Sequence, residues 1–159
     1  MKNDISDFAK LKNDLLVSVS HDLDRNVQLM HEYLELVRND VRKLSYAPDR
    51  LIKNIDKAYE RNVALIEFIS DLTDEIERTT EFSLTSLKVM LSHELRMRHS
   101  SIQVPIVLAE HTMKDLESSS DYLTGLIRKA HEISTSLTDF VDDLIAQIHR
   151  YEQVVGDGQ

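Results

Sequence analysis

Apolar residues recur along this chain at alternating steps of three and four, with polar residues filling the positions between them. This spacing is typical of helices that pack along a coiled-coil-like seam. Four such stripes can be followed, over residues 15–44, 51–76, 84–116 and 123–148. Each stripe predicts one long amphipathic helix, so the pattern predicts an all-α chain of four helices.

The first and third predicted helices depart from this pattern at matching places, where the apolar step is four several times in succession. These positions are Leu15, Val19, Leu23 and Val27 in the first helix and Leu87, Leu91, Leu95 and His99 in the third. Such a stutter changes the local supercoiling of a helix. We therefore expect both helices to be wound differently near these residues.

The chain aligns with itself at an offset of seventy-two residues, without a gap. Residues 49–78 share twelve of thirty positions with residues 121–150. Helical periodicity explains apolar identities but not the identity of Lys57 with Lys129. The sequence therefore predicts an internal repeat over residues 8–78 and 80–150, each copy being a helical hairpin.

Two hairpins that each expose one apolar stripe can bury it against each other. We therefore predict a single domain over residues 1–159, an antiparallel four-helix bundle formed by two tandem hairpins as a single-chain pseudo-dimer. Residues 77–83 are expected to form a tight turn between the copies, because continued helix there would instead favour a domain-swapped dimer. Ser118 is the expected N-cap of the last helix, and residues 1–7 and 153–159 are expected to be loose.

The amino-acid composition argues against several classes of function. The 159 residues include three glycines, two prolines and no cysteine, which excludes disulfides, thiolate nucleophiles and cysteine-bound metals. The formal net charge of −9 argues against a nucleic-acid partner. No apolar run is long enough for membrane insertion and no secretory signal precedes the first helix, so we expect a cytoplasmic monomer.

One histidine stands at the same place in each copy, within Ser20-His21-Asp22-Leu23 and Ser92-His93-Glu94-Leu95. Each histidine lies midway between two stripe residues. At about 100° per residue it points roughly 160° away from both. We therefore expect both imidazoles to face solvent on the outside of the bundle.

Exposed imidazoles next to carboxylates suit nucleophilic chemistry. A neutral imidazole, with a reference pKa of about 6.5, has a free ring nitrogen that can attack phosphorus. Asp22 and Glu94 are placed to accept the other ring proton. Arg25, Arg96 and Arg98 could stabilise a phosphoryl group or meet an acidic partner. No zinc or di-iron motif is present, so any metal would come with the partner.

Three polar residues fall on the apolar stripes themselves. His99 is expected to be a partly buried packing residue. Asn62 and Ser134 hold matching positions in the two copies, and the expected role of each is to set the register of the helices.

The segment 12–23 resembles the first helix of the dimerisation and histidine-phosphotransfer domain of bacterial sensor histidine kinases. Residues 91–96 resemble that family's histidine box more closely, and residues 66–72 and 138–144 resemble its second helix. The resemblance covers nearly the whole chain, twice. It implies that His21 and His93 are phospho-acceptors, with Asp22 and Glu94 as the adjacent acids and Ser18, Arg25, Arg96 and Arg98 at the partner surface.

The chain also departs from this family. It lacks the glycine-rich boxes of an ATP-binding domain and has no P-loop, so we expect no ATP-dependent kinase activity. The position four residues after each histidine holds Arg25 or Met97, where the family's threonine or asparagine would support phosphatase activity. We therefore do not expect water-activating phosphatase chemistry.

The function that follows from the resemblance is histidine phosphotransfer in two-component signalling. His21 and His93 would exchange phosphoryl groups with receiver-domain aspartates of response regulators, with Mg²⁺ on the receiver and no cofactor on this chain. A histidine kinase is a further candidate partner. The alternatives are a non-catalytic module that sequesters a response regulator or inhibits a kinase, and a purely structural scaffold.

Overall fold

The computed structural model describes residues 2–116 and 120–157, and these residues form an all-α bundle. The elements in chain order are α1 (Lys2–Ser18), the π-helical η1 (Val19–Asp24), α2 (Arg25–Arg42), α3 (Asp49–Arg78), the 3₁₀ turn η2 (Glu81–Ser83), α4 (Leu84–Val89), the π-helical η3 (Met90–Leu95), α5 (Arg96–Asp115) and α6 (Asp121–Asp157). The predicted all-α fold is therefore confirmed.

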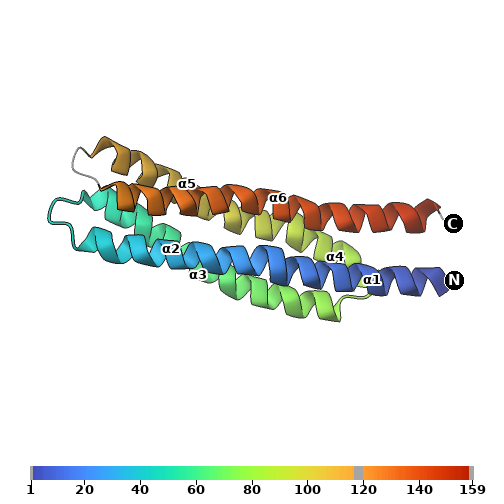
Figure 1. Ribbon diagram of the computed structural model, residues 1–159. Coiled ribbons are helices and arrows are strands. Elements are labelled where there is room, and N and C mark those ends of the chain that lie inside the picture. Colours follow the sequence, from blue (N-terminus) through green and yellow to red (C-terminus); the bar gives the residue numbers. More distant parts are fainter. Residues whose placement is uncertain (1, 117–119, 158–159) are drawn as a thin grey trace.

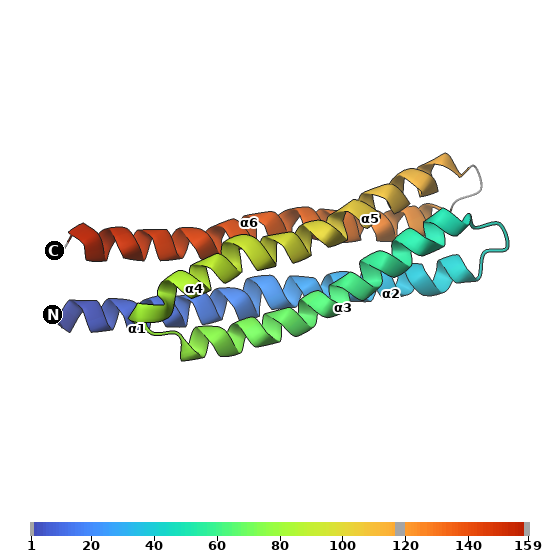
Figure 2. The same ribbon diagram turned by 180° about the vertical axis from the view of Figure 1, so that it is seen from behind.

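These elements make four long antiparallel rods. The first rod is α1, η1 and α2 in continuation, the second is α3, the third is α4, η3 and α5, and the fourth is α6 (Figure 1). Both α2 and α5 pack on α3 and on α6, so the first and third rods lie on one diagonal of the bundle (Figures 1 and 2). Each histidine-bearing rod is thus flanked by the same two neighbours.

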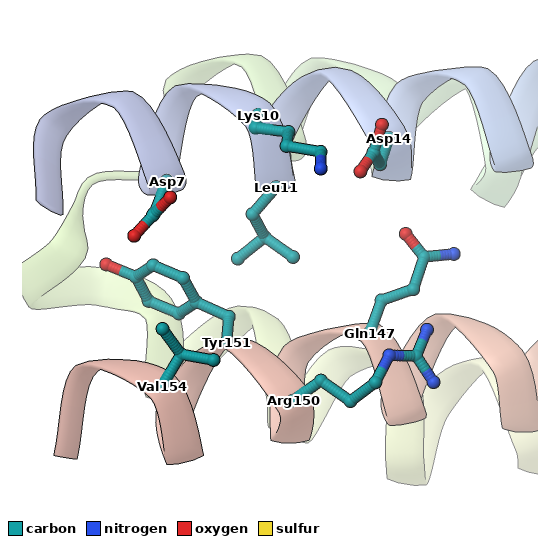
Figure 3. Close-up of a pocket in the computed structure, with 8 residues that line it drawn as sticks. All are labelled: Asp7, Lys10, Leu11, Asp14, Gln147, Arg150, Tyr151 and Val154. Carbon is teal, nitrogen blue, oxygen red and sulfur yellow. The ribbon is translucent and has the colours of Figure 1, made fainter. Parts of the chain in front are cut away.

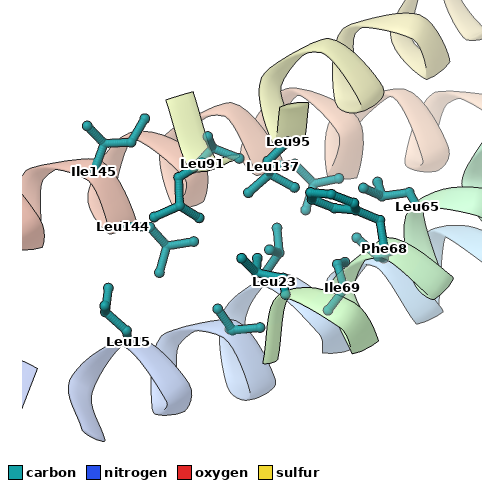
Figure 4. Close-up of a cluster of buried hydrophobic side chains, with 14 of the residues drawn as sticks. Leu15, Leu23, Leu65, Phe68, Ile69, Leu91, Leu95, Leu137, Leu144 and Ile145 are labelled. Atoms are coloured by element: carbon teal, nitrogen blue, oxygen red, sulfur yellow. The ribbon is translucent and has the colours of Figure 1, made fainter. Parts of the chain in front are cut away.

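The core is the shared apolar seam of the two hairpins. Buried leucine, isoleucine, valine and phenylalanine side chains of all four rods meet in it (Figure 4). A second cluster, which includes Val37, Ile55, Met113 and Ile127, continues the seam toward the connection over residues 43–48. One chain therefore buries the stripes of both hairpins against each other.

The steps of four explain the π-helical segments. Leu11, Leu15, Val19, Leu23 and Val27 follow one another at this step, and all five are buried. On an α-helix of about 3.6 residues per turn each step of four drifts by about 40°, so four steps would carry the stripe about 160° around the helix. The wider winding of η1 counters this drift, and η3 does the same in the second hairpin.

The predicted turns are largely confirmed. The first rod ends before Pro48, and α3 ends at Arg78 with an extended Thr79, so the tight turn between the copies is formed. The expected cap Ser118 lies outside the described residues, and Ser120 Oγ instead accepts a hydrogen bond from the Leu123 amide at 3.1 Å. Helix extends into both segments that were expected to be loose, because α1 begins at Lys2 and α6 continues to Asp157. The looseness of these ends stays a prediction, and residues 1, 158 and 159 lie outside the described ones.

Pro105 lies inside α5 without ending it. A proline has no amide hydrogen, so it leaves the carbonyl four residues earlier without its helical donor. That carbonyl belongs to Ser101, and Arg61 Nη1 of α3 donates to it at 2.7 Å. A side chain of the first hairpin thus replaces the hydrogen bond that the proline removes from the second.

A buried polar contact crosses each hairpin at the same level. In the first hairpin Asn62 Nδ2 donates to the Val27 carbonyl at 3.2 Å. In the second, His99 Nε2 donates to the Ser134 carbonyl at 2.5 Å. The positions match across the repeat, but the donor stands on the second rod in one hairpin and on the third rod in the other. His99 is only 5% exposed, so it is more deeply buried than the sequence suggested.

Replacing Leu91 by alanine should destabilise the bundle by about 2–5 kcal/mol, because Leu91 is fully buried and the seam would keep a cavity. Met97→Ala on the same rod is the matched control. Met97 is 58% exposed, and its loss should change stability by no more than about 0.5 kcal/mol. Chemical denaturation followed by circular dichroism measures both. Equal losses would contradict the assignment of the seam.

Burial lowers the pKa of His99, and the hydrogen bond to the Ser134 carbonyl offsets this only in part. The unfolded chain therefore takes up a proton on this ring at a higher pH than the folded chain does. As the pH falls from about 6.5 toward the lowered folded-state pKa, His99 should reduce stability by at most about 1.4 kcal/mol per pH unit.

His99→Gln keeps a hydrogen-bond donor but cannot titrate. The stability difference between the parent and this variant should therefore vary with pH below 6.5 and level off above it. Urea denaturation at a series of pH values measures this difference. A difference that does not vary with pH would show that the His99 ring is not held neutral.

Candidate functional site

His21 and His93 lie on the two π-helical segments, η1 and η3. Both are exposed, and the stripe residues two positions before and after each of them are buried. The prediction that both imidazoles face solvent is therefore confirmed. Because the two rods are diagonal neighbours, the histidines lie on opposite sides of the bundle.

The acids next to the histidines do not contact the rings in this structure. Among the described residues, no hydrogen bond or ion pair joins His21 to Asp22 or His93 to Glu94. Both carboxylates are exposed, so side-chain rotation is free to bring them toward a ring. The Asp22 backbone carbonyl accepts a hydrogen bond from Asn26 Nδ2, one turn further along.

Two of the predicted partner-surface residues are held by α6. Gln147 Nε2 donates to Ser18 Oγ at 3.0 Å, which links the first rod to the fourth. Arg96 Nη2 forms a 2.5 Å ion pair with Asp142 Oδ1. Exposed pairs of this kind contribute about 0–1 kcal/mol, so Arg96 can exchange its partner for a bound phosphoryl group at little cost.

The other two predicted arginines differ from each other. The Arg98 guanidinium carbon lies 4.8 Å from the ring centre of Phe68, which holds it against α3. Arg25 is exposed, and it lines a shallow hollow on α2 together with Ser20, Asp24 and Glu32. A second hollow, between α2 and α3, is lined by Ser20, Asp24 and residues of α3 that include Asp74. The surroundings of His21 are therefore rich in carboxylates.

A separate groove lies between the start of α1 and the end of α6, away from both histidines. It is lined by Asp7, Lys10, Leu11, Asp14, Gln147, Arg150, Tyr151 and Val154 (Figure 3). Its apolar floor is flanked by groups of both charges. None of the predicted site residues lines it.

Sequence reasoning missed a polar cluster on the second hairpin. The Glu110 carboxylate accepts a 2.6 Å hydrogen bond from His131 Nδ1, and Lys114 lies 3.4 Å from it. Burial raises the pKa of Glu110, but the hydrogen bonds and positive charges of His131 and Lys114 outweigh this, and the net shift of the pKa is downward. The i,i+4 spacing of Glu110 and Lys114 was the one signal available in the sequence.

The described residues contain no group of three or more histidine, cysteine, aspartate or glutamate side chains arranged to hold a metal ion. In the same part of the chain, no helix combines the length and the apolar character that crossing a membrane requires. Comparisons with protein-family models, with curated proteins and with solved structures found no match for this chain.

Diethyl pyrocarbonate, which acylates accessible neutral imidazoles, should modify His21 and His93 early in a time course. His99 should react at least about tenfold more slowly, because its ring reacts only when the packed rods open locally. Peptide mass spectrometry measures each rate, with the exposed His111 as an internal reference. Slow modification of either His21 or His93 would contradict their outward placement.

Proposed function

We propose that this chain is a histidine phosphotransfer protein, which exchanges phosphoryl groups between His21 or His93 and the receiver-domain aspartates of response regulators in two-component signalling. The observation that carries the proposal is the matched pair of exposed histidines, each on a π-helical turn of an otherwise regular rod. π-helical segments are rare and are frequent at functional sites. Packing of the stripe accounts for the winding itself, so the support for the proposal lies in the exposed histidine that stands at the same place on both turns.

The transfer step needs little from this chain beyond an accessible nucleophile. The lone pair of a neutral imidazole nitrogen forms the N–P bond as the P–O bond of the receiver's aspartyl phosphate breaks, and the aspartate leaves as a carboxylate. The proton on the other ring nitrogen is lost to water or to the adjacent carboxylate, Asp22 or Glu94. Mg²⁺ held by the receiver offsets the phosphoryl charge.

The rods suit docking of a folded partner. Each histidine is exposed on a rod that is flanked by α3 and α6, so a receiver can approach the ring from solvent. The histidines face opposite sides, so one receiver does not block the second site. Phosphoryl groups would enter from receivers and leave to receivers, because the chain carries no nucleotide-binding motif.

The test is to incubate the protein with receiver domains of the source organism that have been phosphorylated with radiolabelled acetyl phosphate and Mg²⁺. We expect label on this chain that is labile to acid and stable to alkali, as phosphohistidine is. The double variant His21→Gln/His93→Gln should lose at least about 99% of this label, because these two imidazoles are the proposed phospho-acceptors.

His111→Gln is the matched control, since His111 is also an exposed histidine on the third rod. This variant should label as the parent does. Equal labelling of the double variant would refute the proposal. If receivers bind the parent and the double variant alike and no phosphate ever moves, the chain is instead a non-catalytic module that sequesters a response regulator.

A further inference from the structure

The two histidine faces differ in their chemistry although they occupy equivalent places in the fold. The hollow beside His21 is lined by Ser20 and Asp24 of η1 and by Arg25, Gln28, Leu29 and Glu32 of α2. The positions that match Asp24, Arg25 and Glu32 seventy-two residues later on α5 are Arg96, Met97 and Val104. Arg96 thus stands in the second hairpin where the first has Asp24. Met97 and Val104 stand where the first hairpin has the charged residues Arg25 and Glu32.

Three exposed apolar residues on the outer side of α5, Met97, Val104 and Leu108, form the α5 strip, with Ser100 between the first two. Met97 is 58% exposed, Val104 60% and Leu108 48%. With the half-exposed Val107 and the small Ser100, Val104 and Leu108 line a shallow apolar hollow. Residues 100–109 contain no charged side chain. A helix that is apolar on its outer side as well as its inner side normally packs against something on both.

This strip begins one helical turn from His93. The step of four from His93 to Met97 places both on the outer side of the third rod, and steps of seven and four then lead to Val104 and Leu108. In the first hairpin the positions of Val104 and Val107 hold Glu32 and Glu35, which are exposed. The position of Leu108 holds Leu36, which is also exposed. Carboxylates therefore break up the corresponding surface of α2, on the His21 face, but not the strip on α5.

The local charge differs in the same direction. Within five residues of His21 the charged side chains are Asp22, Asp24 and Arg25, which sum to −1. Within five residues of His93 they are Lys88, Glu94, Arg96 and Arg98, which sum to +2. An aspartyl phosphate carries a charge of about −2 near neutral pH, so the carboxylates of the first face repel it. At the second face Glu152 pairs with Lys88 and Asp142 pairs with Arg96, so Arg98 supplies the remaining positive charge and Arg96 adds to it when it exchanges its partner.

The size of the strip indicates what covers it. Three exposed side chains and one half-exposed valine offer far less than the roughly 800 Å² per partner that a stable interface buries. A permanent dimer of this chain through α5 would therefore be too weakly held. A transient partner that brings its own acidic, phosphorylated site to Arg96 and Arg98 fits both the area and the charge.

We infer that the two histidines are not equivalent: the receiver docks on the α5 strip formed by Met97, Val104 and Leu108 and transfers its phosphoryl group to His93, whereas the His21 face is not a docking site. This inference rests on the proposed function and assigns the transfer to one of its two sites. Val104 is the residue that most distinguishes the faces, because Glu32 stands in its place on α2.

The test compares two phosphoryl donors. Phosphoramidate is a small donor that needs no docking surface, so it should label the exposed His21 and His93 at rates within about threefold of each other. A receiver domain charged with radiolabelled acetyl phosphate should label His93 alone. Label should therefore persist in His21→Gln and disappear in His93→Gln.

Val104→Glu introduces at this position the residue that the first hairpin carries. It should lower the rate of transfer from the receiver by at least about tenfold, because a carboxylate is left unpaired in an apolar interface. Labelling by phosphoramidate should not change. The reciprocal variant, Glu32→Val, is the matched control and should leave transfer to His93 as it is. Thermal unfolding of both variants establishes that the fold is intact.

Four outcomes would overturn the inference. Equal transfer to both histidines, or transfer that Val104→Glu leaves unchanged, would refute the inequality of the faces and leave the proposed function standing. Light scattering that shows a dimer which Val104→Glu dissociates, with transfer unaffected, would assign the strip to self-association. If no receiver labels either histidine while phosphoramidate labels both, the proposed function itself fails.

Discussion

The structure depends on one constraint: two hairpins of a single chain must hide their apolar stripes in one shared seam. A stripe that advances by steps of four cannot stay on one side of a regular α-helix, since each step drifts by about 40°. Burial of Leu15, Val19 and Leu23 in the first rod is therefore possible only with the wider winding that η1 provides. The free energy gained by burying these side chains stabilises a backbone geometry that is otherwise unfavourable. That geometry in turn presents His21 and, in the third rod, His93 to solvent.

The polar contacts inside the seam follow from the same constraint, because a buried polar donor without a partner costs free energy. Asn62 Nδ2 has such a partner, whereas Asn62 Oδ1 is buried without a hydrogen-bond partner among the described residues. Asn62 and His99 both donate to a backbone carbonyl across their own hairpin, at matching levels and from different rods. Arg61 supplies the hydrogen bond that Pro105 removes from α5, and it does so from the other hairpin. The two hairpins therefore differ in their buried polar contacts and cannot replace each other. A swapped arrangement of two chains would have to reproduce these pairings, and the turn at Thr79 keeps them within one chain.

Much of the fold could be predicted from the sequence because periodicity reports burial directly. The apolar stripes predicted the four rods, and the successive steps of four predicted where the helices are wound differently. The place of His21 between Val19 and Leu23 predicted that its side chain is exposed. What could not be predicted depends on contacts between distant residues. The sequence does not show that Ser18 meets Gln147 or that Arg96 meets Asp142, because rod-to-rod register decides these pairs. The depth of His99 was underestimated for the same reason, since its partner Ser134 lies thirty-five residues away.

The two hairpins are more alike at their buried positions than at their exposed ones. Seam positions of the two hairpins hold similar residues because both face the same crowded core, where a change of volume is costly. Outer positions are under no such restriction, and there the rods differ: Asp24 against Arg96, and Glu32 against Val104. An exposed valine in place of a carboxylate contributes nothing to the seam and lowers solubility, so packing gives no reason for it. Binding of a partner at α5 does give one. A bundle that is nearly symmetric in its core can in this way present two different faces from equivalent helices.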